Sequence, residues 1–195
     1  GNSVEANTSG GDGASRIIVI RSGAPVSYVP SDATTVTGVN ADFNTALDQG
    51  SGNKIVYDGS GNSVTVTGLS PLTTYHFAVY EYNGSGSTAN YHTTGAGTAN
   101  ATTLAAEPTT VATVTLQRVR PDTAFTALSG GNGAGRLAVI STSPVTFIPV
   151  DTTVYTGASG NISTASDLGS GNYLVYNAAT ATSISVRGLS AGTTY

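Results

Sequence analysis

Residues 69–84 read LSPLTTYHFAVYEYNG, and this stretch decides the fold that we expect. From residue 75 to residue 82 the side chains follow a period of two, which predicts a β-strand that packs one face on a core. The two faces are expected to be Tyr75, Phe77 and Val79 inward and His76, Ala78 and Tyr80 outward.

Further short strands are predicted on both sides of this stretch. Residues 63–67 and 183–186 alternate between polar and apolar side chains, and residues 16–20 and 173–176 are short apolar runs bounded by Gly, Ser or Asn. The one helix-like stretch, 42–49, is short and runs into glycine. Short strands separated by turn residues indicate an all-β sandwich.

The chain contains an internal repeat, offset by 119–120 residues, that holds register through four matched segments. Arg16 corresponds to Arg136, and Tyr75 corresponds to Tyr195. Such register predicts two copies of one structural unit in tandem. The matched segments are 11–20 with 131–140, 25–38 with 144–157, 50–57 with 169–176, and 63–75 with 183–195.

The stretch 69–84 resembles the corner and following strand of fibronectin type III domains, where Leu-x-Pro-x-Thr-x-Tyr precedes an alternating strand. The resemblance rests on Leu69, Pro71, Thr73 and Tyr75. It implies tandem Ig-like, fibronectin type III-like β-sandwiches, and it implies a tyrosine corner at Tyr75, whose hydroxyl bonds to upstream backbone. In the second copy Tyr195 holds the same place, although Ala191 replaces the proline.

Stretches such as GNGAGRLAVI and TTYHFAVYEYNG also resemble modules of large secreted Bacteroidetes proteins. Proteins of that kind commonly serve as adhesins, gliding proteins or multidomain surface enzymes. The resemblance therefore implies a secreted or cell-surface location.

The repeat also predicts domain boundaries. We expect a first domain over 1–104 that lacks its first strand (strand A), a linker over 105–110, and a second domain over 111–195 that lacks its last two strands (F and G). Two explanations stay open: the natural polypeptide continues the array, or a neighbouring chain supplies the missing strands.

Composition argues against several classes of function. Charged residues make up 9% of the chain, far below the usual ~25%. Seven Lys and Arg face eleven Asp and Glu, so a nucleic-acid interface is not expected. Cysteine is absent, and no run approaches the ~18 apolar residues of a membrane span.

The candidate ligand site is a repeated loop. Asp48 and Asp167 each precede a Gly-Ser-Gly-Asn sequence, and oxygen ligands on a glycine-rich loop can hold Ca²⁺. Each loop supplies a single carboxylate and matches no established calcium motif, so a structural turn is the favoured interpretation. We expect no cofactor.

Two further surface roles are considered. Thr123 and Thr152 follow aspartates in triplets that resemble the O-glycosylation sites of Bacteroidetes, which makes them glycosylation candidates. Tyr80, Tyr82 and Tyr91 are considered as an exposed face for stacking on sugars, with ordinary cross-strand packing as the favoured alternative.

The sequence therefore predicts a non-catalytic module. The leading function is a spacer or stalk in a cell-surface adhesin or extracellular filament, with neighbouring repeats or subunits as partners. The alternatives are an accessory array of a secreted polysaccharide-degrading enzyme, or a module that binds surface glycans or proteins.

Overall fold

The computed structural model describes residues 2–179 and 181–195, and this part of the chain is all-β. Every paired strand is antiparallel, and the only helical element is a 3₁₀ turn at Gly86–Thr88 among these residues. The predicted all-β class is confirmed. No helix in the described ranges is long and apolar enough to cross a bilayer.

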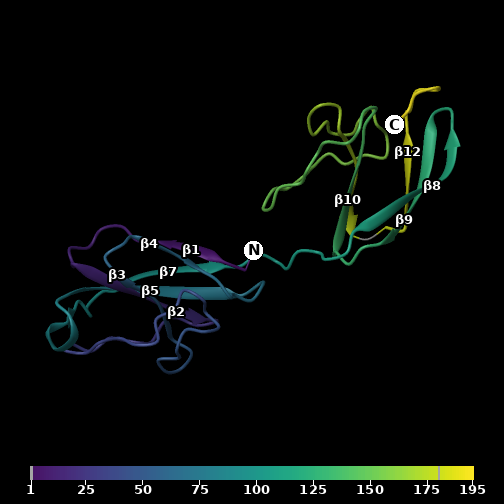
Figure 1. The fold of residues 1–195 in the computed structure, drawn as a ribbon. Coiled ribbons are helices and arrows are strands. Elements are labelled where there is room, and N and C mark those ends of the chain that lie inside the picture. Colours follow the sequence, from purple (N-terminus) through teal and green to yellow (C-terminus); the bar gives the residue numbers. More distant parts are fainter. Residues whose placement is uncertain (1, 180) are drawn as a thin grey trace. The chain divides into compact units, whose positions relative to one another are not determined.

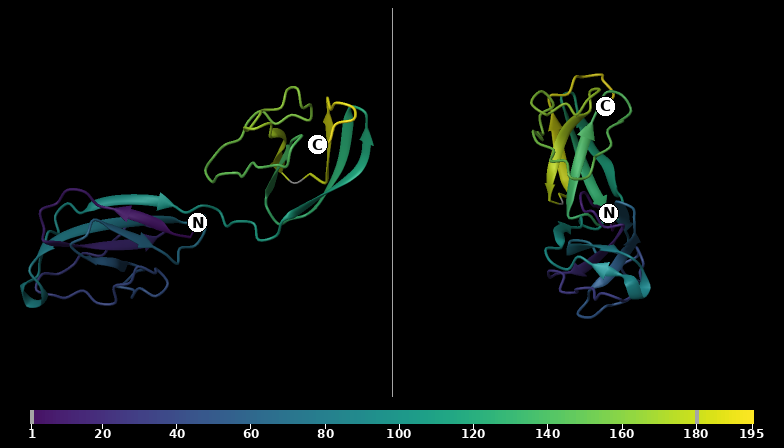
Figure 2. Two further views of the ribbon diagram at one scale, coloured as in Figure 1. Left: turned by 45° about the horizontal axis from the view of Figure 1, so that its top comes forward. Right: turned by 90° about the vertical axis from the view of Figure 1, so that its left-hand side faces the viewer.

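The chain divides into two compact units, Gly1–Ala106 (unit 1) and Glu107–Tyr195 (unit 2). In unit 1, β2 is the central strand of a sheet ordered β3-β2-β5-β6, and β7 also pairs with β5 (Figure 1). A separate pair, β1 with β4, forms a second layer (Figures 1 and 2). The strands are β1 (Val4–Asn7), β2 (Ser15–Ser22), β3 (Lys54–Gly59), β4 (Ser63–Val66), β5 (Thr74–Asn83), β6 (Asn90–Tyr91) and β7 (Gly97–Thr102).

The central sheet of unit 1 is buried on both faces. Along β2, Ile18 and Ile20 pack with Tyr75 toward the β1–β4 pair. Ile17 and Val19 point the other way, into a second apolar cluster. Four consecutive apolar residues with at most 1% exposure are the pattern of a strand covered on both sides.

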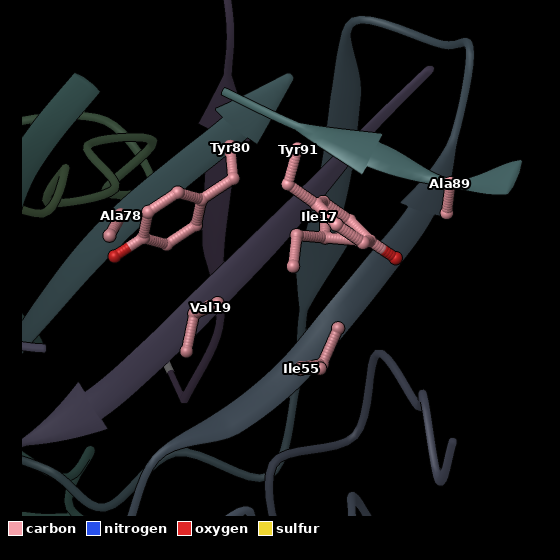
Figure 3. Packing of buried hydrophobic residues seen from close by; sticks show 7 residues of the cluster. All are labelled: Ile17, Val19, Ile55, Ala78, Tyr80, Ala89 and Tyr91. Atoms are coloured by element: carbon pink, nitrogen blue, oxygen red, sulfur yellow. The ribbon is translucent and has the colours of Figure 1, made fainter. Parts of the chain in front are cut away.

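This second cluster corrects the expected orientation of β5. Ala78 and Tyr80 do point away from Tyr75 and Phe77, but they are 2% and 6% exposed instead of facing solvent. Their side chains lie in one layer with Ile17 and Val19 of β2, and Tyr91 of β6 joins them (Figure 3). The outward face of the predicted strand is therefore a second core.

Residues 23–53, here called the covering segment, form the outer wall of this second core. Within it Val26, Tyr28 and Val36 pack against the cluster. The segment contains no regular strand, and isolated bridges at Asp42 and Asp48 tie it to its neighbours. The helix-like stretch 42–49 forms turns and bridges instead of a helix. The N–H groups of Thr45 and Ala46 donate to the carbonyl of Asp42, and this single turn does not continue.

Unit 2 contains a three-stranded sheet, ordered β12-β9-β8, and a β10–β11 pair. Registers match between the units: Ser183 lies opposite Ala127, as Ser63 lies opposite Asn7. β9 and β12 are thus the counterparts of β1 and β4. The strands are β8 (Ala112–Arg120), β9 (Thr123–Gly130), β10 (Gly135–Ile140), β11 (Tyr173–Ala179) and β12 (Ser183–Arg187).

The counterpart of β2 is less buried in unit 2. Leu137 and Val139 of β10 are half-buried, whereas Ile17 and Val19 of β2 are fully buried. Among the described residues β10 pairs with β11 alone, while β2 pairs with both β3 and β5. The lower burial of β10 accompanies its having one paired neighbour among the described residues.

Burial on both faces predicts that Ile17→Ala and Ile18→Ala destabilise unit 1 alike. Each removes a fully buried side chain, so each should lower the free energy of unfolding by about 2–4 kcal/mol. Chemical denaturation of the purified chain measures this, with Leu137→Ala as the half-buried control in unit 2. A loss below about 1 kcal/mol for Ile17→Ala would show that the covering segment does not seal the second core.

Candidate functional site

Two tyrosine hydroxyls bind backbone at matched positions. The N–H of Ser70 donates to the hydroxyl of Tyr75 at 2.9 Å, and the N–H of Ser190 donates to the hydroxyl of Tyr195 at 3.0 Å. Tyr75 is 1% exposed, and its ring meets that of Phe43 edge-on at 5.2 Å between centroids. Tyr195 is 37% exposed. Both hydroxyls contact backbone five residues upstream, so each ties its strand to the preceding turn.

In the repeated Asp loops, the aspartate carboxylates accept hydrogen bonds from backbone N–H groups of the same loop. One carboxylate oxygen of Asp48 accepts the N–H groups of Gly50 and Gly52 at 2.8 and 3.0 Å. The carboxylate of Asp167 accepts the N–H of Gly169 at 2.8 Å. Within residues 2–179 and 181–195, no three His, Asp or Glu side chains gather as a set of metal ligands. Each aspartate thus lies where it stabilises a tight turn.

The last residue of each loop is a buried amide that sequence reasoning missed. Asn53 is 2% exposed; its amide nitrogen donates to Ser27 Oγ at 3.0 Å and to the carbonyl of Gly50, and its oxygen accepts the N–H of Ser27 at 3.0 Å. Asn172 is equally buried and makes the same contacts to Thr146 and Gly169. The repetition of Gly-Ser-Gly-Asn was the available signal, and it marks a structural tie between two distant parts of each unit.

Tyr80 and Tyr91 donate hydrogen bonds to the covering segment, and Tyr82 packs beside Tyr91. The hydroxyl of Tyr80 donates to the carbonyl of Tyr28 at 2.7 Å, and the hydroxyl of Tyr91 donates to the carbonyl of Thr34 at 3.4 Å. Tyr82 lies directly opposite Tyr91 across β5 and β6, with ring centroids 4.8 Å apart.

The tyrosines therefore do not form the exposed sugar-stacking face that was considered. Tyr80 and Tyr91 are 6% and 5% exposed, so neither ring offers a free surface. Burial raises the pKa of Tyr80 and of Tyr91. Burial, followed by the hydrogen bond to Asp58 at 2.6 Å, raises the pKa of Tyr82 to about 12. Cross-strand packing is the arrangement that the structure shows.

A buried ion pair closes one end of unit 1. Arg16 Nε lies 3.1 Å from Glu81 Oε1, and the guanidinium also donates to Thr8 Oγ1 at 2.9 Å and to Asn62. These partners come from β5 and from the segments beside β1 and β4, so one arginine joins both layers. The guanidinium thus has partners from both layers of unit 1, which indicates a role in holding them together.

The two glycosylation candidates differ in accessibility. Thr123 is 8% exposed, and its hydroxyl donates to Asp122 Oδ1 at 3.0 Å. Thr152 is exposed and has a positive φ of 62° in a turn, where its hydroxyl donates to the carbonyl of Asp151 at 2.6 Å. Of the two, Thr152 is the hydroxyl that a modifying enzyme can reach.

Unit 1 has an open groove of about 660 Å³, lined mainly by β1, β5 and β7. Val4 and Ala6 of β1 form one wall, and Ala99 and Ala101 of β7 form the other. Ile18, Phe77 and Val79 also line the groove, together with the acidic residues Glu5 and Glu81.

The groove brings together none of the sequence-predicted candidates: Asp48, Asp167, Thr123, Thr152, Tyr75 and Tyr195 all lie outside it. Its lining is mostly small and apolar residues, with Glu5, Glu81 and His92 among them. Comparison of the chain with known protein families, with curated proteins and with solved structures finds no match.

The buried amide predicts a sharp difference within one loop. Asn53→Ala removes three buried hydrogen bonds and should lower the free energy of unfolding by about 2–3 kcal/mol. Asp48→Ala removes exposed turn contacts and should cost about 0.5–1 kcal/mol. Thermal melts should be the same in Ca²⁺ and in EDTA. A calcium-dependent melting temperature that is lost in Asp48→Ala would instead identify the loop as a metal site.

The raised pKa of Tyr82 predicts a loss of stability at high pH. Folding favours the protonated phenol, so this contribution is complete below pH 10 and is lost as the pH rises through about 12. Urea midpoints of the wild type should fall across this window. Tyr82→Phe should flatten the fall, although the raised pKa values of Tyr28, Tyr80 and Tyr91 keep part of it. Parallel pH curves for the two proteins would contradict the assignment.

Proposed function

We propose that this chain is a structural spacer or stalk module of a secreted or cell-surface bacterial protein, built from fibronectin type III-like sandwiches and without catalytic activity of its own. The observation that carries the proposal is repetition: four strands, their registers and the loop ties recur at an offset of 119–120 residues. Repeated units with the same internal ties are typical of proteins whose task is to span distance.

The course of the chain through unit 2 supports this proposal. β8 starts where Ala112 lies opposite Gly130, and it ends where Arg120 lies opposite Thr123. β12 ends at that same end of the sheet, because Arg187 also lies opposite Thr123. The chain therefore enters the sheet at one end and leaves it at the other, a span of about 30 Å for a nine-residue strand.

The polar chemistry of the chain also supports a structural task. The carboxylates of Asp48 and Asp167 accept turn N–H groups, and that of Glu81 pairs with a buried arginine. The carboxylate of Asp32 accepts the N–H of Tyr91 at 2.7 Å. Each of these carboxylates thus has a contact that holds part of the fold in place.

Stretching a recombinant array of this chain between two surfaces tests the proposal. Unit 1 should unfold in one discrete step and release about 350 Å of chain, since its 106 residues extend by about 3.3–3.6 Å each. The resistance should come from the long β2–β5 and β5–β7 ladders, and Ile17→Ala should weaken it.

Extension without discrete steps would contradict a load-bearing role. A glycan array supplies the second arm of the test, because specific and saturable binding of a sugar would favour a binding module instead.

A further inference from the structure

The basic residues of this chain are confined to its strands. All seven Lys and Arg lie within β-strands, whereas eight of the eleven Asp and Glu lie outside them, so the loops do carry charge, but of one sign. The basic residues are Arg16 and Arg21 in β2, Lys54 in β3, Arg118 and Arg120 in β8, Arg136 in β10, and Arg187 in β12. The acidic residues outside strands are Asp12, Asp32, Asp42, Asp48, Glu107, Asp122, Asp151 and Asp167.

The connections that lack basic residues include the longest ones. The covering segment (23–53), its counterpart 141–172 and the connection 103–111 contain neither Lys nor Arg. Proteases cut folded proteins mainly in such exposed segments, because the active-site cleft takes up a stretch of backbone that is free of the fold. A protease that requires Lys or Arg before the cleaved bond therefore finds no recognition residue in these segments.

In unit 1 both the backbone and the side chains of the basic residues are held. Arg16 and Arg21 pair with β5, and Lys54 pairs with β2. Arg16 is 7% exposed, the guanidinium of Arg21 donates to the carbonyl of Pro25 at 2.8 Å, and Lys54 Nζ donates to the carbonyl of Phe43 at 2.6 Å. Cleavage after any of the three requires that β2 or β3 first leave a sheet that is buried on both faces.

Two arginines of unit 2 are held in a similar way. The guanidinium of Arg136 donates to the carbonyls of Gly130 and Ala181. The side chain of Arg187 is exposed, but its N–H donates to the carbonyl of Gly160 at 2.7 Å, and its own carbonyl accepts the N–H of Ile162 at 3.0 Å. The bond that a protease would attack after Arg187 is thus engaged on the protein side.

The remaining two arginines lie on β8 and are exposed. Arg118 and Arg120 pair with Phe125 and Thr123 of β9. Arg120 is followed by Pro121, whose ring nitrogen makes the next peptide bond a poor substrate for trypsin-like proteases. Arg118 is therefore the least protected basic residue, and its ladder with β9 is the protection that it has.

We propose that the folded chain resists proteases that cleave after Lys or Arg, and that the placement of its basic residues is the cause. Rigidity of the whole chain is not the cause, because residues 104–107 are exposed and lie outside the strands. A secreted protein meets such enzymes outside the cell, so this resistance suits the proposed location. The inference itself rests on the seven positions and not on the spacer role.

Trypsin digestion of the native whole chain tests the placement. The wild type should stay intact, and an Ala105→Lys chain should be cut after position 105 at least about 100-fold faster than at any strand site, because a strand must open before it can be cleaved. The neutral control Ala105→Gln should behave as the wild type. Position 105 is exposed, so circular dichroism should show the same fold for all three chains.

Mass spectrometry of the fragments distinguishes the outcomes. After heat denaturation the wild type should be cut at every basic residue except Arg120, which shows that the fold protects the native chain. Native wild type that is cut after Arg118, or at any other strand site, as fast as Ala105→Lys is cut would overturn the proposal. An Ala105→Lys chain as resistant as the wild type would also overturn it, since the placement of basic residues would then make no difference.

Discussion

Burial of one sheet on both faces is the constraint on which the rest of unit 1 depends. β2 supplies consecutive apolar side chains to two opposite clusters, so neither side of the sheet can face water. One side is closed by the β1–β4 pair, and the other by a segment without regular strands. The long connection between β2 and β3 thus covers one face of the sheet.

The polar residues of unit 1 serve this two-sided arrangement. Tyrosine hydroxyls from β5 and β6 hold the carbonyls of Tyr28 and Thr34, and the Asn53 amide holds Ser27. Each contact satisfies a polar group that would otherwise be buried without a partner. On the opposite side, Arg16 joins both layers through Glu81, Thr8 and Asn62. The covering segment is held by such contacts in place of a strand ladder.

Much of the fold could be predicted from the sequence, because alternation and repetition are local signals. The apolar run at 16–20 predicted a strand, and the fixed offset predicted two related units. The double burial was missed, although a run of four aliphatic residues in β2 is the pattern of a strand covered on both sides. Tyr80 was assigned to solvent because its partner, the carbonyl of Tyr28, lies 52 residues away.

The candidate site was less predictable than the fold, for a related reason. In the Gly-Ser-Gly-Asn loop the sequence points to the aspartate, because carboxylates bind metals. The buried hydrogen bonds of the loop come instead from the neutral Asn53, whose partner Ser27 lies 26 residues earlier. The groove was invisible to sequence patterns, since its walls come from β1 and β7, which lie at opposite ends of unit 1.

The tie between Asn53 and Ser27 also bears on how unit 1 opens. The covering segment is held by side-chain contacts and isolated bridges, whereas β2 and β5 are joined by a long strand ladder. We therefore expect residues 23–53 to open before that ladder does. Breathing of this segment would expose Tyr80 and Tyr91 while the ladder beneath stays intact.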